Sequence, residues 1–138
     1  MRKVRVRGTI VLLLVPLTLI GCGAYRERSL CRQYDDFQAA VAEAQQLDPE
    51  TATGDEVAAV ADDVLAELDQ LMAASDGVYD STISTLRASL TEFRDAAFAL
   101  GTAEADDAAR LLLEDRWDRV VVDYQVLTQR LDVACSTD

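Results

Sequence analysis

The chain contains no histidine and no asparagine, and its only lysine is Lys3. Histidine is the residue that most often performs general acid–base catalysis. Its absence excludes a Ser-His-Asp triad, a Cys-His pair and a Glu-x-x-His di-metal site. A Ser-Lys dyad is excluded from residues 22–138, and the chain has no phosphate-binding glycine loop and no Cys-x-x-Cys motif. The sequence therefore predicts a protein that is not an enzyme and that has no cofactor and no metal site.

Acidic residues are abundant, and several occur as adjacent pairs, at 35–36, 62–63, 106–107 and 114–115. Adjacent residues on a helix point about 100° apart, so these pairs do not converge by themselves. The EF-hand spacing of acids around a central glycine is also missing. A solvated surface is the simplest interpretation. The alternatives are weak binding of divalent cations and a carboxylate-dependent hydrolase that uses two acids from different helices.

The N-terminus has the three zones of a secretory signal. Residues 1–8 carry Arg2, Lys3, Arg5 and Arg7 without an acid, and an uncharged apolar run follows over residues 9–20. This run is shorter than the roughly 20 residues that a transmembrane helix needs. A cleaved signal is therefore expected rather than a permanent membrane span.

The end of this run, Leu19-Ile20-Gly21-Cys22, resembles the lipobox of bacterial prolipoproteins. The resemblance covers the first 22 residues and implies transfer of a lipid to the sulfur of Cys22, followed by cleavage before it. The expected parts are a signal peptide at 1–21, a tether at 22–29 and a domain at 30–138, anchored in the cell membrane on its extracytoplasmic face. The alternative is an ordinary signal peptide that ends near a cysteine.

Removal of the signal makes the chain more acidic. Residues 22–138 keep 9 of the 13 basic residues and all 25 acidic residues, which gives a net charge of −16. Nucleic-acid phosphates would repel such a chain, so binding to DNA or RNA is not expected.

Three cysteines are present, and lipidation of Cys22 would leave the pair Cys31 and Cys135. The extracytoplasmic side is oxidising, which favours a disulfide between them. Two free thiols in a reducing environment are the alternative. The disulfide would close a loop of about 100 residues, worth roughly 4.7 kcal/mol in the chain-entropy model.

Four stretches have apolar residues three or four positions apart, the spacing of an amphipathic helix. They predict helices over residues 30–47, 55–74, 81–100 and 103–134. Thr53 and Glu56 have capping-box spacing at the start of the second helix, and Asp76-Gly77 is typical of its end. The apolar seams are Leu30, Tyr34, Phe37, Val41 and Ala44; Val57, Ala61, Val64, Leu68 and Leu71; Ile83, Leu86, Leu90, Phe93, Ala97 and Leu100; Leu113, Trp117, Val120, Tyr124, Leu127, Leu131 and Ala134.

These seams predict an all-α fold, an antiparallel up-down-up-down four-helix bundle with shallow packing angles. In that topology the start of the first helix and the end of the fourth lie at the same end of the bundle. Cys31 and Cys135 fall at those two places. The disulfide and the topology therefore support each other, and the short tether places this end of the bundle toward the membrane.

Some apolar residues are left over once each helix has been given one apolar seam. Leu111, Leu112 and Leu113 are consecutive, so they cannot all face the core. With Phe98, Leu111 and Leu112 form a candidate patch for an unidentified protein partner; the alternative is that a wide helix face, or residues 48–54, covers them. Trp117 and Tyr124 are interpreted as core residues rather than as a ligand platform.

The function expected from these features is that of a non-catalytic interaction or scaffold module of the cell envelope. A carrier or sensor for a small apolar or cationic ligand is the alternative. That function would need a cavity between the helices, whereas the seams are expected to be filled with Leu, Val and Phe.

Overall fold

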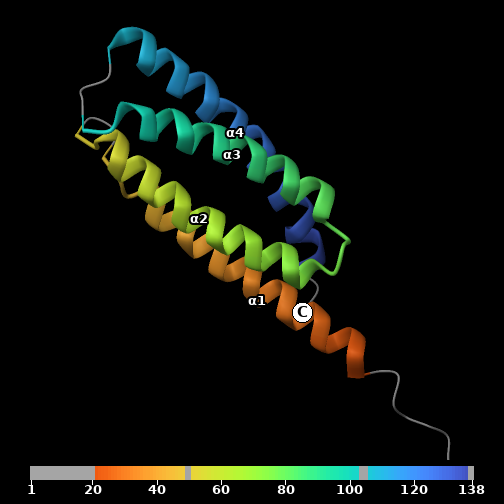
Figure 1. Cartoon of the computed structure of the whole chain (residues 1–138). Helices are drawn as coiled ribbons and strands as arrows, with labels where there is room; N and C mark the ends of the chain where they lie inside the picture. Colours follow the sequence, from red (N-terminus) through yellow and green to blue (C-terminus); the bar gives the residue numbers. More distant parts are fainter. Residues whose placement is uncertain (1–20, 49–50, 103–105, 137–138) are drawn as a thin grey trace, which may run out of the picture.

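The computed structural model describes residues 21–48, 51–102 and 106–136. These residues contain four helices and no strand (Figure 1): α1 (Gly21–Ala44), α2 (Gly54–Ser75), α3 (Asp80–Leu100) and α4 (Asp107–Cys135). The expected all-α fold is thus confirmed for the described part of the chain. No helix in this part combines the length and the hydropathy needed to cross a membrane. Most of the expected signal peptide, residues 1–20, lies outside the described residues.

Helix α1 begins earlier than the sequence analysis expected. It starts at Gly21, so the residues expected to form a tether are helical, and it ends at Ala44 rather than near residue 47. Figure 1 shows the first turns of α1 continuing past the ends of the other helices. Arg26, on these turns, forms an exposed ion pair with Asp76, which follows α2, at 2.9 Å. At 1.5 Å per residue, the helix rises about 14 Å between Cys22 and Cys31.

The expected capping box starts α2. The backbone nitrogen of Thr53 donates to the Glu56 carboxylate at 2.7 Å, and the Glu56 nitrogen donates to the Thr53 hydroxyl at 3.3 Å. These bonds satisfy donors that the first turn of a helix leaves unpaired. The helix ends, as expected, at Asp76-Gly77, although the residue in the left-handed conformation at its C-cap is Asp76, with φ 51°.

Gly54 brings two distant connections together at one end of the bundle. The backbone nitrogen of Asp55 donates to the carbonyl oxygen of Gly101 at 3.1 Å. A Cβ atom at position 54 would lie only 2.9 Å from the Leu100 Cβ and 3.0 Å from the Gly101 oxygen. A glycine is required here because any side chain would separate the α1–α2 connection from the α3–α4 connection. We call this end, defined by the Asp55–Gly101 hydrogen bond, the loop end.

The core consists mainly of residues from α2 and α3, joined by a few from the outer helices. Its fully buried large side chains are Phe37, Leu68, Leu71, Ile83, Leu86, Leu127 and Leu131. Helix α4 is the longest helix described, yet it buries only Val120, Leu127 and Leu131. The expected seam on α4 therefore holds from Val120 to Leu131, where Tyr124 is half-buried against the core, but it fails at Trp117, which is exposed.

The helices pack in chain order, α1 against α2, α2 against α3 and α3 against α4, and α1 and α4 make the least contact of the neighbouring pairs. The expected disulfide between Cys31 and Cys135 is present, with the two Cα atoms 5.5 Å apart. It joins the first half of α1 to the last residue of α4. We call this the disulfide end of the bundle.

We predict that replacing both disulfide cysteines, with Cys31→Ser and Cys135→Ser, lowers the free energy of unfolding by up to about 4.7 kcal/mol. The bond links two residues that are 104 positions apart in the sequence, and its loss restores the conformational freedom of the loop between them in the unfolded chain. Urea denaturation followed by circular dichroism measures the change, with Cys22→Ser as the control. An unchanged unfolding midpoint in the double variant would contradict the prediction.

Candidate functional site

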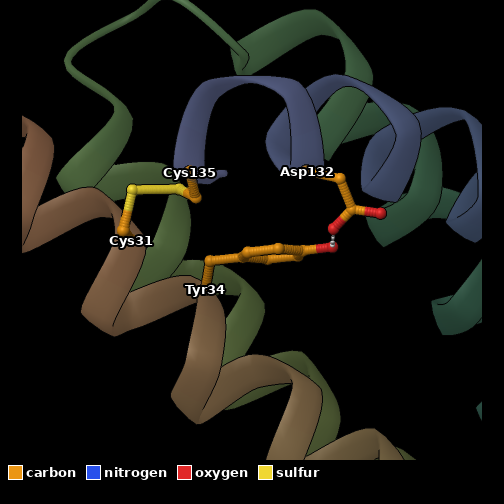
Figure 2. Close-up of a disulfide and its surroundings, with 4 residues drawn as sticks. All are labelled: Cys31, Tyr34, Asp132 and Cys135. Carbon is orange, nitrogen blue, oxygen red and sulfur yellow. Dashed lines mark hydrogen bonds between the residues drawn. A yellow bond between two sulfur atoms is a disulfide. The ribbon is translucent and has the colours of Figure 1, made fainter. Parts of the chain in front are cut away.

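Among the described residues, three side-chain pairs join α1 to α4 along one face of α1 at steps of three residues. The first is the Cys31–Cys135 disulfide. One turn further, the Tyr34 hydroxyl donates a hydrogen bond to Oδ1 of Asp132 at 2.6 Å, and Figure 2 shows this pair beside the disulfide. Next, the Phe37 ring lies with its centroid 6.0 Å from that of Tyr124. Together these pairs hold α1 against α4 at the disulfide end.

Tyr34 is the buried polar member of this set. Its side chain is only 4% exposed, and its hydroxyl reaches the exposed carboxylate of Asp132. Burial and the neighbouring carboxylate both raise the pKa of Tyr34 far above the usual tyrosine range. The phenol therefore stays protonated and keeps donating its hydrogen bond over the whole physiological pH range.

From Phe37 toward the loop end, an open cleft of about 620 Å³ separates α1 from α4. All four helices contribute apolar side chains to it, among them Val41, Val60, Phe93 and Val121. Its volume falls within the roughly 300–1,000 Å³ of ligand pockets. The sequence analysis expected this space to be filled, and that expectation is wrong because α4 is held against α1 mainly at the disulfide end.

The lining of the cleft is apolar and uncharged. Among the described residues, none that lines it is Asp, Glu, Lys or Arg, although 28% of the chain is charged. Its hydrogen-bonding side chains are the amides of Gln45 and Gln125, the hydroxyl of Tyr124 and the indole N–H of Trp117. Burial, followed by the nearby Asp132 carboxylate, raises the pKa of Tyr124, so its hydroxyl also stays protonated. Such a surface is suited to binding an apolar molecule and offers no acid–base pair for a reaction.

Trp117 borders the opening of the cleft and is 41% exposed, so it is not the core residue that we expected. Its ring packs beside Phe93, with the centroids 5.3 Å apart. Trp117, Val121 and Tyr124 are spaced by four and three residues and form a second apolar stripe beside Val120, Leu127 and Leu131. An apolar stripe wider than one seam was the sequence signal for this cleft. The sequence analysis assigned Trp117 and Tyr124 to the core and did not place Val121.

The candidate partner patch is exposed to solvent. Phe98 is 68% exposed, Leu111 66% and Leu112 48%. Phe98 lies in the last turn of α3, and the two leucines lie in the second turn of α4, on either side of the α3–α4 connection. The alternative that neighbouring segments cover these residues is therefore wrong, while their binding to a partner stays a prediction.

The adjacent acidic pairs at 35–36, 62–63, 106–107 and 114–115 are all exposed. Two of these acids form surface ion pairs, Asp62 with Arg94 at 3.6 Å and Asp115 with Arg119 at 2.8 Å. Within the described residues, no three Asp, Glu, Cys or His side chains are arranged to hold a metal ion. In this part of the chain the acids form a solvated surface rather than a cluster.

No protein-family model, curated protein or solved structure matches this chain. The assignment of a function therefore rests on the geometry and chemistry of the chain itself.

We predict that Tyr34→Phe lowers the free energy of unfolding by about 1 kcal/mol at neutral pH, because the hydrogen bond to Asp132 is lost. The same substitution should flatten the alkaline limb of the stability profile. The raised pKa of Tyr34 means that the folded state holds the phenolic proton more tightly than the unfolded state does. The contribution of Tyr34 to the free energy of unfolding is complete below about pH 10, where the unfolded phenol is protonated. It is lost progressively as the pH rises above about 10.

Urea denaturation from about pH 8 to pH 11 measures the alkaline profile around the ordinary tyrosine pKa. The parent protein should lose stability more steeply than Tyr34→Phe. Tyr25→Phe, at a side chain that is 78% exposed, is the control for loss of a surface phenol. Parallel profiles for the parent and Tyr34→Phe would show that the buried phenol contributes nothing to the pH dependence.

Proposed function

We propose that this chain is a bacterial lipoprotein, anchored through a lipid on Cys22 at the extracytoplasmic face of the cell membrane, whose helical domain binds an apolar ligand without catalysis. The observation that carries the ligand-binding part is the apolar cleft of about 620 Å³ between α1 and α4. Its uncharged lining favours binding over reaction chemistry, because it contains no group with which to activate a nucleophile or transfer a proton at neutral pH. Ligand binding in a cleft is the function of a carrier or sensor rather than that of a scaffold module.

The anchor and the cleft fit together through α1. Cys22 lies in the first turn of α1, and the cleft begins near Phe37, about 22 Å further along the same helix. In an up-down-up-down bundle the disulfide end would face the membrane and the loop end would face away from it. The Asp55–Gly101 contact and the Cys31–Cys135 bond support that arrangement. The exposed side chains of Arg26, Arg28 and Arg32 would then lie near anionic lipid headgroups. Each arginine would strengthen binding to the membrane surface by about 1 kcal/mol.

A second candidate function is recognition of a protein partner in the cell envelope. The exposure of Phe98, Leu111 and Leu112 favours it, because large apolar side chains left in contact with water mark interaction sites where they form one patch. Both functions are compatible with one anchored module, since the patch residues do not line the cleft.

We predict that Val121→Glu weakens binding of the uncharged fluorescent probe N-phenyl-1-naphthylamine by at least about tenfold, or 1.4 kcal/mol. Val121 lines the cleft, and a carboxylate there would lose its hydration when the probe binds. Trp117 borders the cleft and is the only tryptophan in the chain. Energy transfer from Trp117 to the probe therefore reports binding at this site, with the full chain held in phosphatidylcholine vesicles.

Val122→Glu is the matched control. Val122 is the next residue on α4, is 57% exposed and does not line the cleft. Val122→Glu introduces the same charge one position away from Val121. Its affinity for the probe should therefore stay within about twofold of that of the parent protein. Equal weakening by both variants, or no energy transfer in the parent, would overturn the assignment of the cleft as the binding site.

We predict that Cys22→Ser abolishes incorporation of labelled palmitate and moves the protein from the membrane fraction to the soluble fraction or leaves it unprocessed. Stable anchoring needs two acyl chains, and the lipobox cysteine is the residue that would carry them. Cys31→Ser should keep the label, which separates loss of the lipid from loss of the disulfide. Labelling that persists in Cys22→Ser would contradict the proposed anchor.

A further inference from the structure

We infer that the occupant of the cleft is an uncharged amphiphile, a single apolar chain that ends in a hydroxyl or a similar neutral group, rather than a fatty acid, a cationic amphiphile or a peptide helix. This inference rests on the proposed function, because it names the chemical class of the ligand that the same cleft takes.

Charge is the first argument. A ligand carboxylate in the cleft would find no partner, because none of the described lining residues is a cation. The arginines that are ion-paired, such as Arg87 with Asp69 at 2.6 Å and Arg116 with Glu92, lie outside the lining. An ammonium ligand would likewise find no acid in the lining, because the nearby Asp132 carboxylate lies outside it and already accepts the hydrogen bond of Tyr34. Burying either charge without a partner carries a large desolvation cost, and a neutral headgroup avoids it.

The polar groups that do line the cleft are matched to a neutral headgroup. Gln45 and Gln125 each offer an amide donor and an amide acceptor. The ring of Tyr124 packs beside Phe37, where the cleft begins, so Tyr124 lies toward the disulfide end of the cleft. Its hydroxyl is protonated at neutral pH and can donate to an alcohol or ester oxygen. No protein hydrogen bond to this hydroxyl is present in the described residues.

Size is the argument against a peptide. The α1 side of the cleft runs from Phe37 to Ala44, about 10 Å of helix, and ends at Leu47 beyond it. A peptide helix docked along it would be limited to about two turns, and isolated helices that short are marginal in water. An extended apolar chain meets no such limit.

The experiment compares three ligands with the same chain and different headgroups: dodecanol, dodecanoic acid and dodecyltrimethylammonium, each brominated at the chain end. Bromine quenches tryptophan fluorescence on contact, and Trp117 is the only tryptophan. The full chain is held in phosphatidylcholine vesicles at about pH 9, where the acid is ionised. Ligand concentration is expressed per mole of lipid, so that different partitioning into the bilayer does not distort the comparison.

The alcohol should quench Trp117 at a concentration at least about tenfold lower than either charged ligand, a difference of 1.4 kcal/mol. Val121→Glu should remove this quenching and Val122→Glu should keep it. Tyr124→Phe should weaken binding of the alcohol by about threefold to tenfold, the range expected for one hydrogen bond. The same variant should leave binding of brominated dodecane, which has no headgroup, unchanged.

The other outcomes separate the two proposals. If the acid or the ammonium ligand quenches as well as the alcohol, and Val121→Glu removes that quenching, the cleft binds ligands but the neutral class is wrong. If none of the ligands quenches Trp117 more in the parent than in Val121→Glu, the proposed function fails together with this inference.

Discussion

The attachment of α1 to α4 at one end determines the shape of the bundle. The disulfide, the Tyr34–Asp132 hydrogen bond and the Phe37–Tyr124 ring contact occupy successive turns of one face of α1. Toward the loop end, α4 follows α3 instead, through contacts such as Arg116 with Glu92 and Trp117 with Phe93. Because α4 contacts α1 at the disulfide end and α3 toward the loop end, a space remains between α1 and α4. This space is the cleft.

The cleft leaves apolar surface in contact with water, which a four-helix domain normally avoids by closing its core. Val121 and Trp117 remain partly exposed although the adjacent Val120 is buried. Each square ångström of apolar surface left exposed forgoes about 25 cal/mol of stabilisation. A ligand that covers this surface would recover part of that energy and would therefore stabilise the folded state as it binds.

The helices could be predicted from the sequence because each carries an apolar residue every three or four positions, and the disulfide because only two cysteines remain after Cys22. The early start of α1 could not be predicted, because residues 22–28 are too polar to show a helical period. The cleft could not be predicted from the sequence either. Periodicity shows that Trp117 and Tyr124 are apolar members of one face of α4, but a facing helix decides whether they are covered. Similarly, the approach of Gly54 to Gly101 depends on how the connections meet in space.

The disulfide also changes what a protease can accomplish. Residues 31–135 form a covalent ring, so a single cut in either connection at the loop end opens the ring without separating its fragments. Both pieces stay attached to the N-terminal part of α1. Only a cut between residues 22 and 31 detaches the whole domain from Cys22, and that segment is helical, a conformation that proteases must unfold before cleavage. On the proposed attachment at Cys22, a cut in one of these connections would leave the bundle on the membrane rather than release it.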